Sequence, residues 1–455
     1  MPLPLHVVIL AAGEGKRMHS SIPKVLQPIA ARPMIHHVLS AAMALQAKKI
    51  HVVYGFAGDQ VQSACSNYQD IDWVLQSAPL GTGHAVLQAM PNIPQHAQVL
   101  VLYGDVPLIS PDTLGALLKD QPHLAVLIAH MQDPTGYGRI KMTKKGRVSA
   151  IIEQKDADPQ DVLIQDVNTG IITARSDVLR NHLEKLQNCN AQGEYYLTDI
   201  FRMAAHAGNP AQVVRVKDIQ QIFGANDFWQ LAALEREYQL RQAHQLAMQG
   251  VHFADPSRFD LRGTVRAGKN VFIDIDALFE GAIVLGDGVH IGPYVRLKDV
   301  TLGDNTIVDA HCDLDGVITQ SDVQIGPFAR LRPETRLGAN VHIGNFVETK
   351  QTHIGPGSKA NHLTYLGDAS VGSGVNIGAG TITCNYDGIH KSKTVISDNA
   401  FIGSNTSLVA PVQVGTRAVI GAGSVVTQDA PQDALTLARS QQVSIPGWQR
   451  GAKKK

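Results

Sequence analysis

The sequence predicts two domains of different fold class, an α/β domain with a Rossmann-like, mostly parallel sheet and a parallel β-helix of hexapeptide repeats. From residue 1 to about 226, strand-like and helix-like runs alternate, as they do in parallel sheets. From about residue 251, an aliphatic residue followed by glycine recurs at steps close to multiples of six, which is typical of a β-helix. The length of 455 residues is also too great for one hydrophobic core.

The first half contains three β-rich apolar runs, at residues 7–10, 50–54 and 99–103, and a helical pattern at residues 33–45. A glycine-rich segment follows the first of these runs, and the pair Gly104-Asp105 follows the third. In open parallel sheets, ligands bind beyond the carboxyl ends of the strands. We therefore expect a binding site formed by the loops that follow these two strands.

A single long helix is predicted over residues 227–249, with Asp227 as its N-cap and Gly250 as its stop. Either a core helix or a connecting arm fits this pattern. The arm is favoured, because the sequence changes character immediately afterwards. The predicted organisation is therefore a domain at 1–226, a linker helix at 227–250 and a β-helix at 251–455.

The hexapeptide pattern rests on thirteen aliphatic–glycine pairs, separated by 6, 11, 23, 12, 6, 11, 12, 5, 6, 25, 12 and 6 residues. Each aliphatic side chain should point into the coil, and each glycine should permit a corner where a side chain would clash. The repeat by itself specifies no chemistry. Its aliphatic members are Leu285, Ile291, Leu302, Ile325, Leu337, Ile343, Ile354, Leu366, Val371, Ile377, Ile402, Val414 and Ile420.

Composition argues against nucleic-acid and membrane partners, because the 40 basic and 40 acidic residues give a formal net charge of zero. The N-terminal segment lacks a basic region, so we do not expect it to be a signal peptide. No apolar run is long enough to span a bilayer. The basic run at 451–455 is interpreted as a solvated tail. We expect a cytoplasmic protein with reduced thiols, because the four cysteines are far apart: Cys65, Cys189, Cys312 and Cys384.

The segment at residues 10–24, LAAGEGKRMHSSIPK, places a glycine-rich turn directly after a strand. Such a turn exposes backbone N–H groups to a phosphate chain, and Arg17 and Lys24 add two cations. The segment is neither a P-loop nor a dinucleotide fingerprint, since Met18 occupies the position of the third glycine. Taken alone, it also fits a generic turn.

A larger set of motifs resembles the bacterial family of bifunctional N-acetylglucosamine-1-phosphate uridyltransferases and glucosamine-1-phosphate acetyltransferases. The resemblance covers essentially the full length, and Lys16 departs from it where threonine is usual. It implies a nucleotidyltransferase domain of Rossmann-like fold and a left-handed β-helix. The motifs are LAAGxGxRM with PK, WVLQSAPLGTGHA, LYGDVPL, DPTGYGRI, Glu153, NTG, NAQGEYYLTD, ARLRP, NFVETK, KANHLTYLGD and GAGTITCNYDGIHKSK.

The resemblance implies a site for UTP and the UDP-sugar in the first half. Arg17 and Lys24 would neutralise the departing pyrophosphate, and Asp105 and Asn226 would bind Mg²⁺, which prefers a few hard oxygen ligands. The attacking phosphate is already ionised, so no general base is needed. The remaining nucleotide and sugar contacts would come from Leu10, Ala11, Gly13, Gln76, Gly81, Thr82, Tyr103, Gly138, Glu153 and Asn168.

Acetyl transfer requires a base, because a sugar ammonium should titrate at about 7.7 to 8, like an α-amino group. One histidine among nineteen would be structural by default, but the neighbours of His362 match the acetyltransferase half of the family. His362 is therefore predicted to be the base. By resemblance, the sugar phosphate would be bound through Arg332, Lys350, Tyr365, Asn376 and Lys391, and acetyl-CoA through Ala379, Asn385, Tyr386, Ser404, Ala422 and Arg439.

The step of 25 residues from Ile377 to Ile402 predicts a short loop leaving the coil at about 385–391. The family places this loop over a neighbouring subunit, which implies a homotrimer. Two other interpretations of the sequence are a monofunctional nucleotidyltransferase regulated by its β-helix, and a scaffold without activity. A purely regulatory β-helix would not require His362 or Lys350, and a scaffold would not require Asp105. The presence of all three residues therefore favours an enzyme with two activities.

Overall fold

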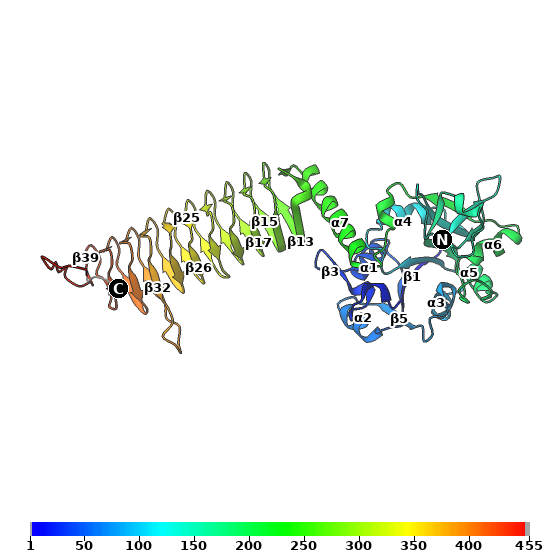
Figure 1. The fold of residues 1–455 in the computed structure, drawn as a ribbon, viewed down its shortest axis with the longest axis horizontal. Coiled ribbons are helices and arrows are strands. Elements are labelled where there is room, and N and C mark those ends of the chain that lie inside the picture. Colours follow the sequence, from blue (N-terminus) through cyan, green and yellow to red (C-terminus); the bar gives the residue numbers. More distant parts are fainter. Residues whose placement is uncertain (1, 451–455) are drawn as a thin grey trace, which may run out of the picture. The chain divides into compact units, whose positions relative to one another are not determined.

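The computed structural model describes residues 2–450, apart from the side chain of Lys16. The basic run at 451–455 lies outside the described residues. The chain divides into two compact units, the first ending at Tyr238 and the second beginning at Gln239 (Figure 1).

The first unit is built on a nine-stranded sheet whose main path has the order β11-β7-β10-β6-β1-β4-β5. The three predicted strands are its centre, where β1 pairs in parallel with both β4 and β6. Strand β10 departs from the expected parallel pattern, since it runs antiparallel to β6 and β7. The strands are β1 (Leu5–Ala11), β4 (Lys49–Tyr54), β5 (Ile71–Leu75), β6 (Gln98–Tyr103), β7 (Leu124–His130), β10 (Asp166–Arg175) and β11 (Gln212–Arg215). In addition, β8 (Arg139–Met142) pairs with β10, and β9 (Val148–Ile152) pairs with β8.

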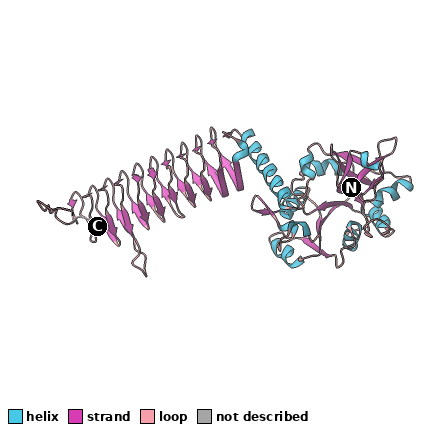
Figure 2. Ribbon diagram, in the orientation of Figure 1, coloured by secondary structure: helices cyan, strands magenta, loops and turns pink. Residues whose placement is uncertain are grey.

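Helices pack around this sheet, which therefore has a hydrophobic core on each side (Figure 2). Successive residues of β1 alternate between the two cores: Val8 and Leu10 join one, while Val7 and Ile9 join the other. Burial on both faces explains why the sequence of this strand is a continuous apolar run. The helices are α1 (Met34–Ala44), α2 (Gly58–Ala64), α3 (Thr82–Ala89), α4 (Pro111–Leu118), α5 (Ser176–Leu183) and α6 (Asp199–His206).

The predicted long helix is α7 (Phe228–Met248), and the division between the units falls inside it. Asp227 caps its first turn by accepting a hydrogen bond from the Gln230 N–H at 2.8 Å. Gly250 follows its end in a left-handed conformation, with φ of 102°. Leu231 and Leu234 belong to a small core of the first unit, whereas Ala243 and Leu246 belong to the core of the second. Each half of α7 is thus an integral part of a different unit.

The second unit is a parallel β-helix, with strands from β12 (His252–Phe253) to β39 (Leu435–Thr436) in sheets of 11 and 17 strands (Figure 1). All thirteen aliphatic residues of the repeat are at most 4% exposed, which confirms that they point into the coil. Two faces matter below. The first contains β25 (His342–Asn345), β28 (Lys359–His362), β31 (Asn376–Ile377), β34 (Phe401–Ile402) and β37 (Val419–Ile420), and the second contains β23 (Arg330–Leu331), β26 (Glu348–Lys350), β29 (Tyr365–Gly367), β32 (Ile382–Cys384) and β35 (Ser407–Val409).

The glycines of the repeat are required by close approach of the next coil. A Cβ on Gly344 would lie 2.0 Å from the Asn361 carbonyl oxygen, and one on Gly303 would lie 2.5 Å from the Gln320 carbonyl carbon. Left-handed backbone at the corners is supplied mostly by other residues, such as Asn305 with φ of 56°. The predicted clash is therefore confirmed, and its partner is the neighbouring coil.

The corner that joins the first face to the second carries an exposed ladder of stacked rings. The ring of His311 stacks between those of Tyr294 and Phe328, with 4.8 Å between centroids on each side, and Phe346 follows at 5.4 Å. The exposed side chain of Leu363 continues this line on the next coil. At the following corners, the ladder gives way to Gly380, Asn405 and Gly423.

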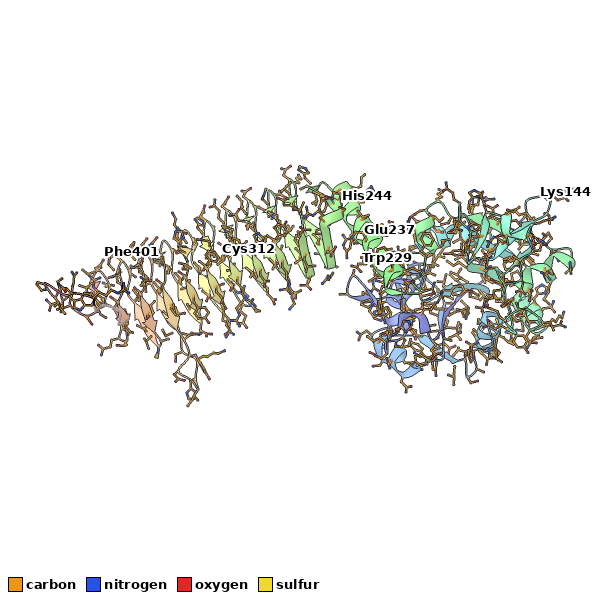
Figure 3. The ribbon with its side chains drawn as sticks, viewed as in Figure 1. Lys144, Trp229, Glu237, His244, Cys312 and Phe401 are labelled. Carbon is orange, nitrogen blue, oxygen red and sulfur yellow. The ribbon has the colours of Figure 1, made fainter. Side chains whose placement is uncertain are left out.

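Among the described residues, no helix combines the length and the apolar character needed to cross a membrane. The four cysteines are free thiols, and Cys312, labelled in Figure 3, is buried within the β-helix.

Candidate functional site

A cavity of about 400 Å³ opens at the carboxyl ends of β1 and β6, where the strand order predicts a site. The glycine-rich loop after β1 forms one wall, and the segment leading into α3 forms another. The cavity brings together eleven of the predicted residues: Leu10, Ala11, Gly13, Arg17, Lys24, Gln76, Gly81, Thr82, Tyr103, Asp105 and Asn226.

Two cations and two oxygen donors are interlocked in this cavity. The Lys24 ammonium forms an ion pair with the Asp105 carboxylate, and both side chains are largely buried. Lys24 Nζ and Arg17 Nη2 each donate to Asn226 Oδ1 at 2.8 Å. Asn226 lies about 200 residues from Lys24 in the chain, so only the fold places it here. The cluster can hold phosphate oxygens through its cations and a hard metal ion through its carboxylate and amide oxygens.

Two distant motifs are joined at the wall of the cavity. The Gly83 N–H donates to the Tyr195 carbonyl at 2.8 Å, and the Tyr195 N–H donates to the Leu80 carbonyl at 2.8 Å. Gly81 has φ of 109°, and a Cβ there would lie 2.7 Å from the Tyr195 oxygen. The GTG motif therefore needs glycine so that the NAQGEYYLTD segment can lie directly against it.

The remaining three predicted residues, Gly138, Glu153 and Asn168, form a second group that does not line the 400 Å³ cavity. Asn168 N–H donates to the Gly138 carbonyl at 2.8 Å, and the Glu153 carboxylate lies beside Gly138. Glu153 accepts a hydrogen bond from the Thr198 hydroxyl at 2.9 Å. Burial raises the pKa of Glu153, although this hydrogen bond opposes the shift.

Tyr103 connects the two groups. Gly170 of the NTG motif lies against its ring, since a Cβ on Gly170 would be 2.5 Å from Tyr103 Cε2. Burial, the largest cause, raises the pKa of Tyr103, and Glu153 and Asp105 add to the shift. The phenol is therefore held neutral between the nucleotide cavity and the second group.

A further cavity of about 660 Å³ shares Arg17, Tyr103, Asp105 and Asn226 with the first. Several residues that line these two cavities were not predicted from the sequence. Glu194, Tyr137 and Thr169 lie inside motifs quoted above, but the motifs gave them no individual role. Gln220 and Gly224 lie outside every quoted motif and show no periodic or charged pattern. The missed residues include Glu194, Tyr137, Thr169, Gln220 and Gly224.

In the β-helix, the strand register aligns five residues at the corner between the first and second faces. Asn345 pairs with His362, and the pairings of β28 with β31, β31 with β34 and β34 with β37 extend the alignment. We call this set the corner column: Asn345, His362, Ala379, Ser404 and Ala422. Arg439 donates to the Ala422 carbonyl at 2.8 Å, so all four predicted acetyl-CoA positions outside the loop lie on or beside this column.

A cationic cluster lies on the second face. The register places Arg332 opposite Lys350 on successive coils, and the Lys391 side chain lies beside Lys350. Hydrogen bonding from Lys391 lowers the pKa of Lys350, with burial and the charge of Lys391 contributing. Arg332 also donates to Glu348 at 3.0 Å. Ammonium groups held this close together suit a dianion such as a phosphate.

Gly367 lies next to this cluster on the same face. A Cβ there would lie 2.3 Å from the Tyr365 hydroxyl and 2.8 Å from Asn385 Nδ2, so both polar groups cover the glycine. Asn385 donates to the Asp368 carboxylate. Of the predicted residues, Asn376 is separate from this cluster, since it begins β31 on the first face.

The extra residues between Ile377 and Ile402 form a projecting hairpin, visible beyond β32 in Figure 1. Tyr386 and Lys391 form an isolated antiparallel bridge across it, and Asp387 accepts hydrogen bonds from the backbone at its tip. Tyr386 and Ile389 are strongly exposed. The predicted loop is thus a projecting hairpin that exposes Tyr386 and Ile389 beside the polar side chains of Asp387 and His390.

Comparisons with known proteins find a family match in each half of the chain. The family described as "MobA-like NTP transferase domain" matches residues 7–192, and "Bacterial transferase hexapeptide (six repeats)" matches residues 393–428. The chain is 59% identical to "Bifunctional protein GlmU" of Stenotrophomonas maltophilia (strain K279a), over 100% of both chains. It is 59% identical to the protein of the same name from Xylella fastidiosa (strain M23), over 100% of this chain and 99% of that one, and 60% identical to that of Xanthomonas axonopodis pv. citri (strain 306), over 100% of both.

Proposed function

The chain belongs to the family of bifunctional GlmU proteins, and from this membership we propose the reaction of each half and the residues that perform it. It is a bifunctional enzyme with a nucleotidyltransferase domain and a hexapeptide acetyltransferase domain. The β-helix acetylates glucosamine-1-phosphate with acetyl-CoA. The α/β domain then transfers UMP from UTP to N-acetylglucosamine-1-phosphate and releases pyrophosphate.

The interlocked cluster of Arg17, Lys24, Asp105 and Asn226 carries the uridylyltransferase proposal. The sugar phosphate attacks the α-phosphorus of UTP in line with the leaving pyrophosphate. Arg17 and Lys24 bind the leaving oxygens and offset the charge that develops there, so the reaction is driven by positioning and electrostatics. The loop after β1 orients the nucleotide, and Tyr103 contacts the sugar.

The oxygen atoms of Asp105 and Asn226 fit Mg²⁺, because they are hard donors and because the Lys24 ammonium already occupies a cation position between them. Bound there with substrate phosphates, Mg²⁺ would supply further neutralisation of the phosphate charge. Asp105 would provide an anionic protein ligand, and Asn226 would provide a neutral one.

The corner column carries the acetyltransferase proposal, because His362 lies one coil away from Ala379. The amine of the sugar attacks the thioester carbonyl carbon, and His362 takes the proton that the amine loses. The C–S bond breaks, and coenzyme A leaves as a thiolate that the imidazolium can reprotonate. Arg332, Lys350 and Lys391 bind the sugar phosphate, and Asn385 and Tyr386 position the amine and the thioester.

We also propose a homotrimer in which each acetyltransferase site is shared between chains. His362 and the cationic cluster lie on two different faces of one chain, and the exposed ring ladder runs along the corner between them. Tyr386 and Ile389 on the hairpin supply further exposed apolar side chains for a neighbouring copy. Mass measurement in solution tests this assembly, and a fully active monomer would contradict it.

Cytoplasmic location is proposed as well, since the free thiols suit a reducing compartment and UTP and acetyl-CoA are cytoplasmic substrates.

One experiment tests the order of the two reactions. The purified protein is incubated with glucosamine-1-phosphate, acetyl-CoA, UTP and Mg²⁺, and the products are separated over time. N-acetylglucosamine-1-phosphate should precede the UDP-sugar, and omission of acetyl-CoA should prevent both. Formation of the acetylated UDP-sugar without acetyl-CoA would overturn the proposal.

A further inference from the structure

The corner column contains one residue for which neither the motifs nor the resemblance provides a role. Asn345 is the last residue of β25 and lies opposite His362 in the parallel register. Its side chain is half-buried, whereas that of His362 is exposed. Adjacent parallel strands lie about 4.8 Å apart, so two side chains on the same face of the coil can meet directly.

These two side chains form a hydrogen bond, with His362 Nδ1 2.9 Å from Asn345 Oδ1. An amide oxygen can only accept, so Nδ1 must carry the proton of the neutral ring. The lone pair is then on Nε2, which is the only ring nitrogen able to accept a proton.

We propose that Asn345 is a positioning residue of the acetyltransferase, which fixes the tautomer and the orientation of His362 so that Nε2 is the base. This inference rests on the proposed function of His362. In the reaction, the proton of the attacking amine moves to Nε2 as the C–N bond forms and the C–S bond breaks. The imidazolium that results keeps its Nδ1–H bond to Asn345, because both ring nitrogens then carry protons.

The arrangement of the column supports this assignment. Asn345 and Ala379 lie on the coils on either side of His362, so the partner of Nδ1 is on the side away from the predicted acetyl-CoA positions. The carbonyl oxygen of Asn345 also accepts from the Leu363 N–H at 3.1 Å, which attaches the residue to the chain immediately after His362. Of the titratable groups on the same two strands, His342 interacts electrostatically with His362, and Lys359 and Asp309 in turn act on His342.

Replacement of Asn345 distinguishes a positioning role from a structural one. Asn345→Ala removes the acceptor, and acetylation kcat should fall by about 10- to 100-fold, the usual cost when a functional histidine loses the partner that orients it. KM for glucosamine-1-phosphate should change less than threefold, since the phosphate-binding cations remain. Asn345→Asp keeps an acceptor for Nδ1–H, so it should restore most of kcat, and its charge should move the acid limb of the pH–rate profile to higher pH.

Two further variants complete the test. Gln324→Ala removes an exposed amide from the preceding strand of the same sheet and should leave both activities unchanged. Asn345→Ala combined with His362→Ala should be no slower than His362→Ala alone, because the two residues act as one unit. Uridylyl transfer serves as the control for folding in every variant.

The outcomes separate the two claims. If His362→Ala acetylates at the parental rate, the proposed function of His362 fails. If His362→Ala is impaired but Asn345→Ala is not, only the present inference fails. A rise in KM with unchanged kcat would instead make Asn345 a substrate contact, and equal losses in Asn345→Ala and Asn345→Asp would make it structural; each result overturns the positioning role.

Discussion

The two halves of the molecule assemble their sites by different means. In the α/β domain, residues far apart in the chain converge at one edge of a sheet, as where the Asn226 amide oxygen accepts hydrogen bonds from both Arg17 and Lys24. In the β-helix, site residues recur at the same place on successive coils, as Asn345 and His362 do. A convergent site depends on the whole fold of its domain, whereas a columnar site depends on the register of a few neighbouring coils.

The largest expected effect tests whether one residue of the column carries proton transfer. His362→Ala should lower acetylation by about 10²- to 10⁴-fold, the usual worth of a positioned base. Residual activity should rise with pH as more of the substrate amine becomes neutral. Steady-state kinetics of both reactions measure this, with uridylyl transfer as the internal control, and an undiminished acetylation rate would reduce His362 to a structural residue.

The corresponding test in the convergent site is Asp105→Asn. The change removes the negative charge that pairs with Lys24 and keeps the shape of the side chain. Uridylyl transfer should fall by about 10²- to 10³-fold, as when one electrostatic contact to a transition state is lost, and raising Mg²⁺ should recover part of it. Acetylation should be unaffected, so equal losses in both activities would indicate misfolding instead.

Fragments of the chain test whether each half of α7 stabilises the unit in which it packs. A fragment of residues 1–226 lacks Leu231 and Leu234, which pack in the first unit, and burying each leucine is worth about 1.5–3 kcal/mol. It should therefore retain uridylyl transfer but unfold at lower urea than a fragment of residues 1–250. A fragment from 239 onward should acetylate and be more stable than one from 251, which lacks Ala243 and Leu246. Equal midpoints within each pair would contradict a divided α7.

Glycine substitutions compare the halves on stability alone. Gly303→Ala in the β-helix would press a methyl group against the next coil and should cost about 1–3 kcal/mol. Gly115→Ala in α4 meets nothing within 4 Å and should add about 0.5–1 kcal/mol through higher helix propensity. Calorimetry of the two variants against the parent measures both shifts, and a neutral Gly303→Ala would show that the coils can separate at low cost.

The last comparison concerns the response of the two units to acid. Burial lowers the pKa of five histidines in the first unit, His6, His36, His37, His123 and His182, against His342 alone among the described residues of the second. Since these groups are harder to protonate when folded, stability is full above about pH 6.5 and falls with pH toward the folded-state values. Each contributes at most about 1.4 kcal/mol per pH unit.

The first unit should therefore weaken more on acidification from pH 7 to 5. Urea unfolding followed by the fluorescence of Trp73, which lies in β5, reports on that unit, and circular dichroism of the 239–455 fragment reports on the β-helix. A steeper loss in the β-helix would contradict the prediction.

The same contrast explains what the sequence could predict. A strict period encodes the β-helix, so the inward residues and the hairpin at 385–391 follow from counting. The glycine-rich loop after β1 and Asp105 lie in short local motifs, so their place at the end of a strand could also be predicted from the sequence. The sequence alone could not indicate that Gly81 lies against Tyr195, or that α7 is divided between two cores, because those facts depend on packing between distant segments.

The corner column also has a fixed axial spacing between its successive members. Neighbouring coils are spaced about 4.8 Å apart, so the four steps from Asn345 to Ala422 span roughly 19 Å along the axis. Under the proposed binding of acetyl-CoA along this column, the reactive end of the carrier reaches the imidazole only if its length matches the number of coils that it spans. Deleting residues 405–422, which form one coil, would keep the strands periodic and shorten the column by about 4.8 Å. Under the same proposed binding, the shortened protein should favour a shorter acyl carrier.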